Sequence, residues 1–161
     1  MTMSRKILIF GGLALAVLGM LYGLHYAVFV EHQTLNNMGG FLFNAFSSAA
    51  TGNMNAAASA VQGYAAVRYD YVRQVDLHSH WVGLAMVMIV LGVIFDSVAF
   101  AEPMRIFLAV TLLTGCATFP LGVILQTLMR GSVIGSALAV AGSILVIAPT
   151  VAIAVGLARG S

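Results

Sequence analysis

Four long apolar runs divide the chain, and the polar segments between them differ greatly in length. The runs cover residues 7–30, 77–100, 106–128 and 133–158. A helix needs about 20 apolar residues to cross the hydrocarbon core of a bilayer, and each run is long enough. The pattern therefore predicts an all-α fold, a bundle of four transmembrane helices that forms a single integral membrane domain.

The segment 31–76 is the one long polar connection. It contains an alanine-rich stretch from Asn53 to Arg68, and Asn53 is a suitable N-terminal cap for a helix. We predict a short amphipathic helix in this loop, lying on the membrane with Phe41, Phe43 and Phe46 inserted. A flexible linker is the alternative, but such linkers rarely contain so many aromatic residues.

The other two connections are short, so the spans that they join should be antiparallel neighbours. They cover residues 101–105, with Pro103, and 129–132. Small residues at helical spacing on the fourth span (Gly135, Ala139 and Gly142) predict close packing against another helix. A row of threonines on the third span (Thr111, Thr114 and Thr118) predicts hydrogen bonds across the bundle.

Composition supports a membrane protein and excludes several other classes. Hydrophobic residues make up 61% of the chain and charged residues only 7%, whereas soluble domains have roughly 25% charged residues. The net charge of +2 without a dense basic run gives no reason to expect nucleic-acid binding. Cys116 is the one cysteine, so a disulfide within the chain is excluded. Phosphate-binding loops and Ser/His/Asp arrangements are absent.

The basic residues predict the orientation in the membrane. Positively charged residues favour the cytoplasmic side, and one end of the predicted bundle has four of them: Arg5, Lys6, Arg105 and Arg159. The opposite end has three: Arg68, Arg73 and Arg130. We predict a multi-pass protein of the inner (plasma) membrane, with both termini in the cytoplasm and the 31–76 loop outside.

All four histidines lie at the same predicted end of the first two spans: His25, His32, His78 and His80. Two spans joined by one loop are usually neighbours, so we expect these rings to converge. Histidine is the commonest transition-metal ligand and also binds heme iron. Tyr22, His25, Phe29 and His32 share one helix face, and a belt at the membrane interface is the alternative interpretation for them.

The helical register of the second span places its two histidines on different faces of the helix. His78 shares a face with small residues and with the acid of this span (Val82, Ala85, Ile89, Gly92 and Asp96), which predicts that His78 points into the bundle. His80 is two residues on, about 160° away, on a bulky face suited to lipid. If the helix began after His80, an extended His-Ser-His could instead offer both rings to one ion. Asp96 is predicted to be paired near the membrane surface rather than to carry protons.

Three segments resemble small four-span proteins related to heme-copper oxidase subunit I: LGMLYGLHYAVF, DLHSHWVGLAMVMIVLGVIF and TFPLGVILQ. That group has a glycine-containing first span, a His-x-His at the start of the second span and a later span with Pro-x-Gly. The resemblance implies that His78 binds a low-spin heme. It covers the four spans but not the 31–76 loop. The later spans that supply the second axial ligand and the copper ligands in large subunit I proteins are absent, so oxygen reduction is not implied.

These observations predict a membrane protein that binds heme b or copper. It would transfer electrons or be an accessory subunit of a respiratory or membrane-oxidoreductase complex. No catalytic residues are predicted in this chain. His78 would be the first ligand and His25 or His80 the second, with His32 as a further metal ligand. The expected partners are the lipid bilayer and either other membrane subunits or a second copy of the chain. The alternatives are a cofactor-free structural subunit that packs through its glycines, and a small transporter.

Overall fold

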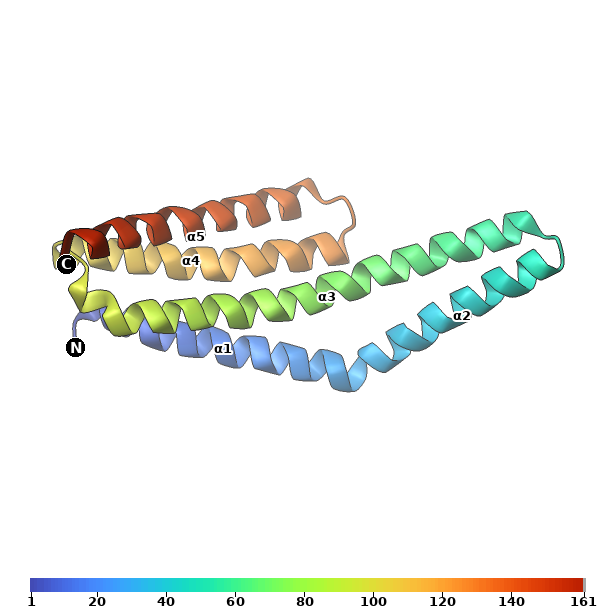
Figure 1. The fold of residues 1–161 in the computed structure, drawn as a ribbon, viewed down its shortest axis with the longest axis horizontal. Helices are drawn as coiled ribbons and strands as arrows, with labels where there is room; N and C mark the ends of the chain where they lie inside the picture. The colour runs from blue at the N-terminus through green and yellow to red at the C-terminus, as the bar shows by residue number, and fades with distance from the viewer. Residues whose placement is uncertain (161) are drawn as a thin grey trace. The chain divides into compact units, whose positions relative to one another are not determined.

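The computed structural model describes residues 1–160 and contains five α-helices and one short 3-10 helix (Figure 1). The α-helices are α1 (Met3–Phe29), α2 (Glu31–Ala50), α3 (Met54–Ile94), α4 (Glu102–Leu128) and α5 (Val133–Gly160), and the 3-10 helix η1 covers Phe95–Ser97. The predicted all-α class is confirmed. Four helices are long and apolar enough to cross a membrane, namely α1, α3 together with η1, α4 and α5. The protein is therefore a multi-span membrane protein.

The chain forms two compact units, which we describe separately. The bundle unit consists of Met1–Met20 and the chain from Leu77 onward. The hairpin unit consists of Leu21–Asp76. Helices α1 and α3 each contribute residues to both units.

The core of the bundle unit is apolar and contains residues from all four of its helices. A glycine allows α1 to approach α3 closely: a Cβ atom on Gly12 would lie 2.9 Å from the Ala85 carbonyl oxygen. Ala85 and Gly92 are buried, as the register of the second span predicts. The buried core residues are Leu8, Leu15, Ala85, Met88, Phe95, Val98, Leu108, Ala109, Leu112, Cys116 and Ile153.

Helices α4 and α5 lie side by side and are joined by a short turn (Figure 1). Their backbones touch at glycines: a Cβ atom on Gly142 would lie 2.6 Å from the Phe119 Cα atom, and one on Gly115 would lie 2.8 Å from the Leu145 Cβ atom. The predicted small-residue stripe is thus confirmed as a packing surface. It is used within the chain, so these glycines are not available to a partner protein.

The threonines of α4 do not bond as predicted. Thr111 donates to the Phe107 carbonyl oxygen at 2.8 Å, and Thr118 donates to the Thr114 carbonyl oxygen at 2.7 Å. A hydroxyl in a helix can reach the carbonyl four residues earlier, which satisfies the hydroxyl locally. The prediction that these hydroxyls bond across the bundle was wrong for both residues.

The hairpin unit pairs α2 with the first part of α3 (Figure 1). The α2 residues that are not exposed recur every three or four positions, as in two helices packed along a narrow seam. They are Glu31, Thr34, Met38, Phe41, Ala45 and Ser48. Matching positions on α3 include Ala57, Ala60, Tyr64, Val67, Tyr71 and Gln74. Gly52, with a φ of 76°, lies in the turn between the two helices.

The segment 31–76 differs from the loop predicted from the sequence. It contains one separate helix, α2, and its alanine-rich second half is the start of α3, which continues without a break from Met54 to Ile94. The polar residues before Leu77 suggested a loop, but they are compatible with a solvated helix. Phe41 is also placed differently from the prediction, since its ring packs against Gly63 inside the hairpin. Phe43 and Phe46 are exposed.

Candidate functional site

Both histidines of the second predicted span lie inside α3. The extended His-Ser-His arrangement, which sequence reasoning left open, is therefore excluded. Two residues along an α-helix turn the side-chain direction by about 200°, so the two rings leave the helix on nearly opposite sides. His78 and His80 of one chain do not bind one ion together.

His78 is half-buried, and its ring is held by a backbone group of α1. Its Nδ1 atom lies 2.9 Å from the carbonyl oxygen of Gly19. A carbonyl oxygen can only accept a hydrogen bond, so Nδ1 must carry the proton and donate it. In a neutral imidazole the lone pair is then on Nε2. Metal-binding histidines usually have this arrangement, with the ring nitrogen away from the metal donating to a carbonyl or carboxylate.

Gly19 makes this bond possible because it has no side chain. A Cβ atom at this position would lie 3.1 Å from the Trp81 Cβ atom and 3.1 Å from the Val82 Cγ2 atom. Contacts of that length are tighter than ordinary van der Waals contact. The glycine therefore lets α1 come close enough for its carbonyl oxygen to reach His78.

His80 has different surroundings on the other side of α3. It is exposed, and the edge of its ring meets Phe119 of α4 with the ring centroids 5.1 Å apart. It also lines an open groove of about 270 Å³ with Ser79, Gly83 and Leu84. His80 thus lies beside α4 at an open groove, and Leu84 and Leu91, on the face predicted for lipid, pack against the core of the bundle.

His25 and His32 belong to the hairpin unit. His25 is exposed and packs against Phe29, with the ring centroids 5.4 Å apart. The Asn36 Nδ2 atom lies 3.2 Å from His32 Nε2, and because an amide nitrogen can only donate, this ring nitrogen accepts. The lone pair of His32 Nε2 is occupied by that bond, which makes His32 a poor ligand through this atom.

Within residues 1–160 no three His, Cys, Asp or Glu side chains come close enough together to hold a metal ion. Of the predicted ligands, His78 has a ring that is oriented by a hydrogen bond to a backbone carbonyl oxygen. Sequence reasoning placed His78 on the inner face of α3 correctly. It missed Gly19 as the hydrogen-bond partner, although the glycines of the first span indicated a close helix contact.

A second polar cluster lies where α1 begins and α3 ends. Asp96 accepts a hydrogen bond of 2.8 Å from the Thr2 hydroxyl and one of 3.1 Å from the Arg5 guanidinium, and Arg105 lies 3.8 Å away. Glu102 accepts hydrogen bonds from the backbone N–H and the hydroxyl of Ser4. The prediction that Asp96 is a paired residue is confirmed. The part played by Glu102 was missed because Ser4 is 98 residues away in the chain.

Comparisons with protein-family models, with curated proteins and with solved structures find no match to this chain.

Proposed function

We propose that the protein binds a b-type heme in the membrane and transfers electrons, and that His78 would hold the heme iron through Nε2. The hydrogen bond between His78 and Gly19 is the observation that carries this proposal. It fixes the tautomer and the direction of the ring before any cofactor arrives, as second-shell bonds do at metal sites.

Heme suits the site better than a bare copper ion because of the number of donors required. His78 and His80 diverge, so α3 offers one imidazole on each side. A copper ion needs several protein donors, whereas the heme macrocycle supplies four nitrogens and leaves only axial positions to the protein. When bound, the heme would supply one-electron transfer through its iron.

A second ligand would come from outside α3. His25 is the remaining imidazole that the sequence suggests, and its ring packs on Phe29 of the same helix. His80 is disfavoured as the partner of His78 on one iron by the helix geometry described above. The test therefore compares the loss of His78 with the loss of His80.

The test is the optical spectrum of the purified protein, oxidised and then reduced with dithionite, together with metal analysis of the same sample. We expect the sharp reduced-minus-oxidised band of a b-type heme. His78→Ala should remove most of the bound heme. His80→Ala is the matched control, because it removes the same side chain two residues away on the opposite side of α3, and it should leave heme content unchanged.

Three results would contradict the proposal in different ways. Equal heme content in the wild-type protein and His78→Ala would exclude His78 as a ligand. Stoichiometric copper without heme would favour a metal-ion protein. A colourless, metal-free protein that still assembles with other membrane proteins would favour the structural-subunit alternative.

A further inference from the structure

One side of the hairpin unit exposes a continuous row of apolar residues on each of its two helices. The residue that follows each seam position lies about 100° further around its helix. Because α2 and α3 are antiparallel, these following residues point to the same side of the hairpin. They are His32, Leu35, Gly39, Leu42, Phe46 and Ala49 on α2, and Ala58, Val61, Ala65, Arg68, Val72 and Val75 on α3, and all are exposed. With Met54, which continues the α3 row, they form what we call the apolar face.

The opposite side of the hairpin is mostly polar or small. It carries the residues that precede the seam positions, among them Gln33, Asn37, Gly40, Asn44 and Ser47 on α2, and Ser59, Gly63, Asp70 and Arg73 on α3. A helix that packs on one side and meets water on the other has this division into an apolar and a polar face. The division therefore indicates that a further layer covers the apolar face but not the polar one.

The apolar face is large enough for a stable protein interface. Seven of its large side chains are between 38% and 73% exposed, namely Leu35, Leu42, Phe46, Met54, Val61, Val72 and Val75. At roughly 150–250 Å² for a fully exposed large side chain, these seven present on the order of 600 Å². A monomer rarely exposes an apolar patch of more than a few hundred Å². Together with its small residues, the face approaches the about 800 Å² that each partner contributes to a standard interface.

Lipid does not account for the outer part of this face. Met54 precedes Leu77, where the second predicted span begins, by 23 residues, or about 35 Å of the unbroken helix α3. The head-group layer is only about 5–8 Å thick on each side of the hydrocarbon core. The cover for the face around Met54 and Phe46 is therefore a protein.

The register of the hairpin places small and large residues at the same height. The Phe41 ring packs against Gly63 across the seam. The Glu31 carboxylate accepts a hydrogen bond of 3.2 Å from the Tyr71 hydroxyl. Since both helices rise equally per residue, the other heights follow by counting from these two contacts. On the apolar face, Phe46 is level with Ala58, Leu42 with Val61, Gly39 with Ala65, and Leu35 with Arg68.

We propose that the apolar face binds the same face of a second copy of this chain, so that two hairpins form a four-helix bundle. A two-fold axis parallel to the hairpin helices brings α3 of each copy against α2 of the other at the same height. Phe46 of one copy then meets Ala58 of the other, which pairs a large side chain with a small one. The same axis keeps the two α3 helices parallel, as two copies inserted in one membrane in the same direction require.

Gly39 has a role in this dimer that it lacks in the single chain. Nothing lies within 4 Å of a Cβ atom placed on Gly39, although a glycine inside a helix is less stable than an alanine. In the dimer Gly39 of one copy faces Ala65 of the other. Two small residues at one height let the helices come close together, as Gly12 and Ala85 do between α1 and α3.

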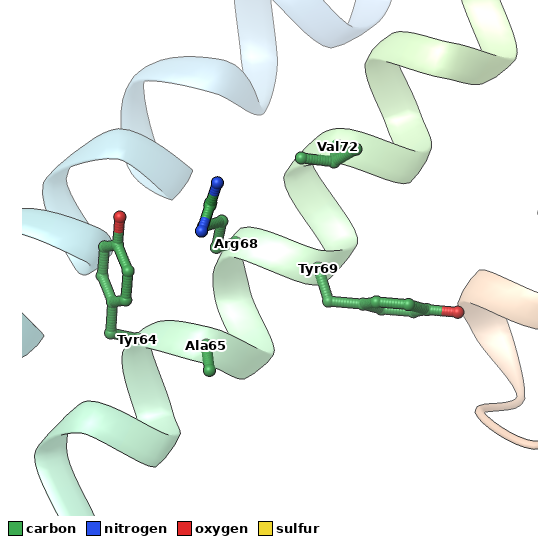
Figure 2. Close-up of a pocket in the computed structure, with 5 residues that line it drawn as sticks. All are labelled: Tyr64, Ala65, Arg68, Tyr69 and Val72. Carbon is green, nitrogen blue, oxygen red and sulfur yellow. The ribbon is translucent and has the colours of Figure 1, made fainter.

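A hollow on the apolar face fits a side chain of the second copy. It has a volume of about 320 Å³ and lies between Tyr64 and Tyr69, which project in opposite directions from α3 in Figure 2. Arg68 lies within the hollow, level with Leu35. Leu35 of the second copy would enter it as a knob enters a hole between two helices. The apolar stem of Arg68 can line the contact while its guanidinium reaches the edge of the interface.

The experiment is disulfide cross-linking of the full-length protein in phosphatidylcholine liposomes. Two differently tagged chains, both with Cys116→Ala, are co-expressed, one with Gly39→Cys and the other with Ala65→Cys. We expect efficient formation of the mixed dimer under mild oxidation. The matched control is the pair Asn44→Cys and Ser59→Cys, which are also level with each other but lie on the polar side. That pair should form about ten times less mixed dimer.

A charge placed on the apolar face tests the same interface without cross-linking. Val61→Glu puts a carboxylate opposite Leu42 of the second copy. It should raise the dissociation constant of the dimer at least tenfold, measured by energy transfer between labelled chains in liposomes. Ser59→Glu adds the same charge on the polar side and should change the constant less than twofold. Circular dichroism of both variants verifies that the helices remain folded.

Three results would overturn the proposal. The first is a wild-type protein that shows no energy transfer between copies in liposomes and is therefore a monomer. The second is equal cross-linking of the two cysteine pairs, and the third is an equal dissociation constant for Val61→Glu and Ser59→Glu. No variant in these experiments changes a histidine, so their outcome is independent of the heme proposal.

Discussion

The contact between His78 and Gly19 places a structural requirement on a residue that has no side chain. Gly19 must leave room for Trp81 and Val82 while its carbonyl oxygen accepts a hydrogen bond from His78 Nδ1. Trp81 is the single tryptophan of the sequence. Its fluorescence therefore reports on the place where α1 and α3 meet, and a heme bound to His78, three residues away, would quench it.

This leads to a prediction for Gly19→Ala. The added methyl group forces α1 away from α3 by a few tenths of an ångström, which weakens the hydrogen bond to His78. The net value of such a bond is about 1 kcal/mol, or roughly a fivefold change in affinity. Titration of the cofactor-free protein with hemin, followed by quenching of Trp81, should show a loss of affinity of about this size.

Gly83→Ala provides the control for that titration. Nothing lies within 4 Å of a Cβ atom placed on Gly83, so the same substitution there adds a methyl group without displacing a helix. Unchanged hemin affinity in Gly19→Ala would mean that the Gly19 carbonyl does not position the ligand.

The inward direction of His78 was predictable because it depends only on spacing within one helix. The identity of its partner was not, since that depends on how far α1 is shifted along α3. The shift is determined by where glycines let the backbones meet, at Gly12 against Ala85 and at Gly19 against Trp81. The sequence shows the glycines but not which residues face them.

Among the helices, the apolar spans were predicted well and the hairpin was not. The third and fourth spans were expected at 106–128 and 133–158 and are found at Glu102–Leu128 and Val133–Gly160. Glu102–Arg105 seemed a turn because of Pro103, but proline is well tolerated in the first turn of a helix. The seam between α2 and α3 includes polar positions such as Thr34, Ser48 and Gln74, so it lacks the strong apolar repeat that reveals a helical pair.

The close contact between α4 and α5 predicts a strong effect for Gly142→Leu. Even a Cβ atom at this position would meet the backbone of Phe119, so the larger side chain must separate the helices. Overpacking of this kind costs roughly 1–3 kcal/mol. The thermal unfolding midpoint in detergent, measured by circular dichroism, should fall clearly below that of the wild-type protein.

Ala141→Leu is the matched control for that measurement. Ala141 is exposed and precedes Gly142 in the same helix, so its side chain points away from α4. Its unfolding midpoint should stay close to the wild-type value. If both variants unfolded at the wild-type temperature, the α4–α5 contact would contribute nothing to stability.

At the scale of the whole bundle unit, the polar cluster around Asp96 joins three separate parts of the chain. It ties the start of α1 to η1 through Asp96 and to the start of α4 through Glu102. Arg105 contributes to both carboxylates, 3.8 Å from Asp96 and 3.3 Å from Glu102. Groups that share partners in this way are not energetically independent.

A double-mutant cycle at Arg5 and Asp96 tests this coupling. Arg5→Gln and Asp96→Asn should each lower the unfolding midpoint at low salt, and the double variant should lower it by less than the sum of the two. Lys6→Gln, an exposed neighbour, serves as the control for charge. Strictly additive effects would show that the contact between Arg5 and Asp96 does not stabilise the bundle.

The same cluster imposes an order on biosynthesis. Thr2 and Arg5 leave the ribosome 94 and 91 residues before Asp96, and Ser4 leaves it 98 residues before Glu102. Throughout that interval the first helix has no carboxylate from the later chain to hold its leading end. That end becomes tied down only when the end of α3 and the start of α4 arrive. A nascent chain stopped before Asp96 could therefore pack α1 against α3 at Gly12 and Gly19, but the start of α1 would lack the carboxylates that hold it.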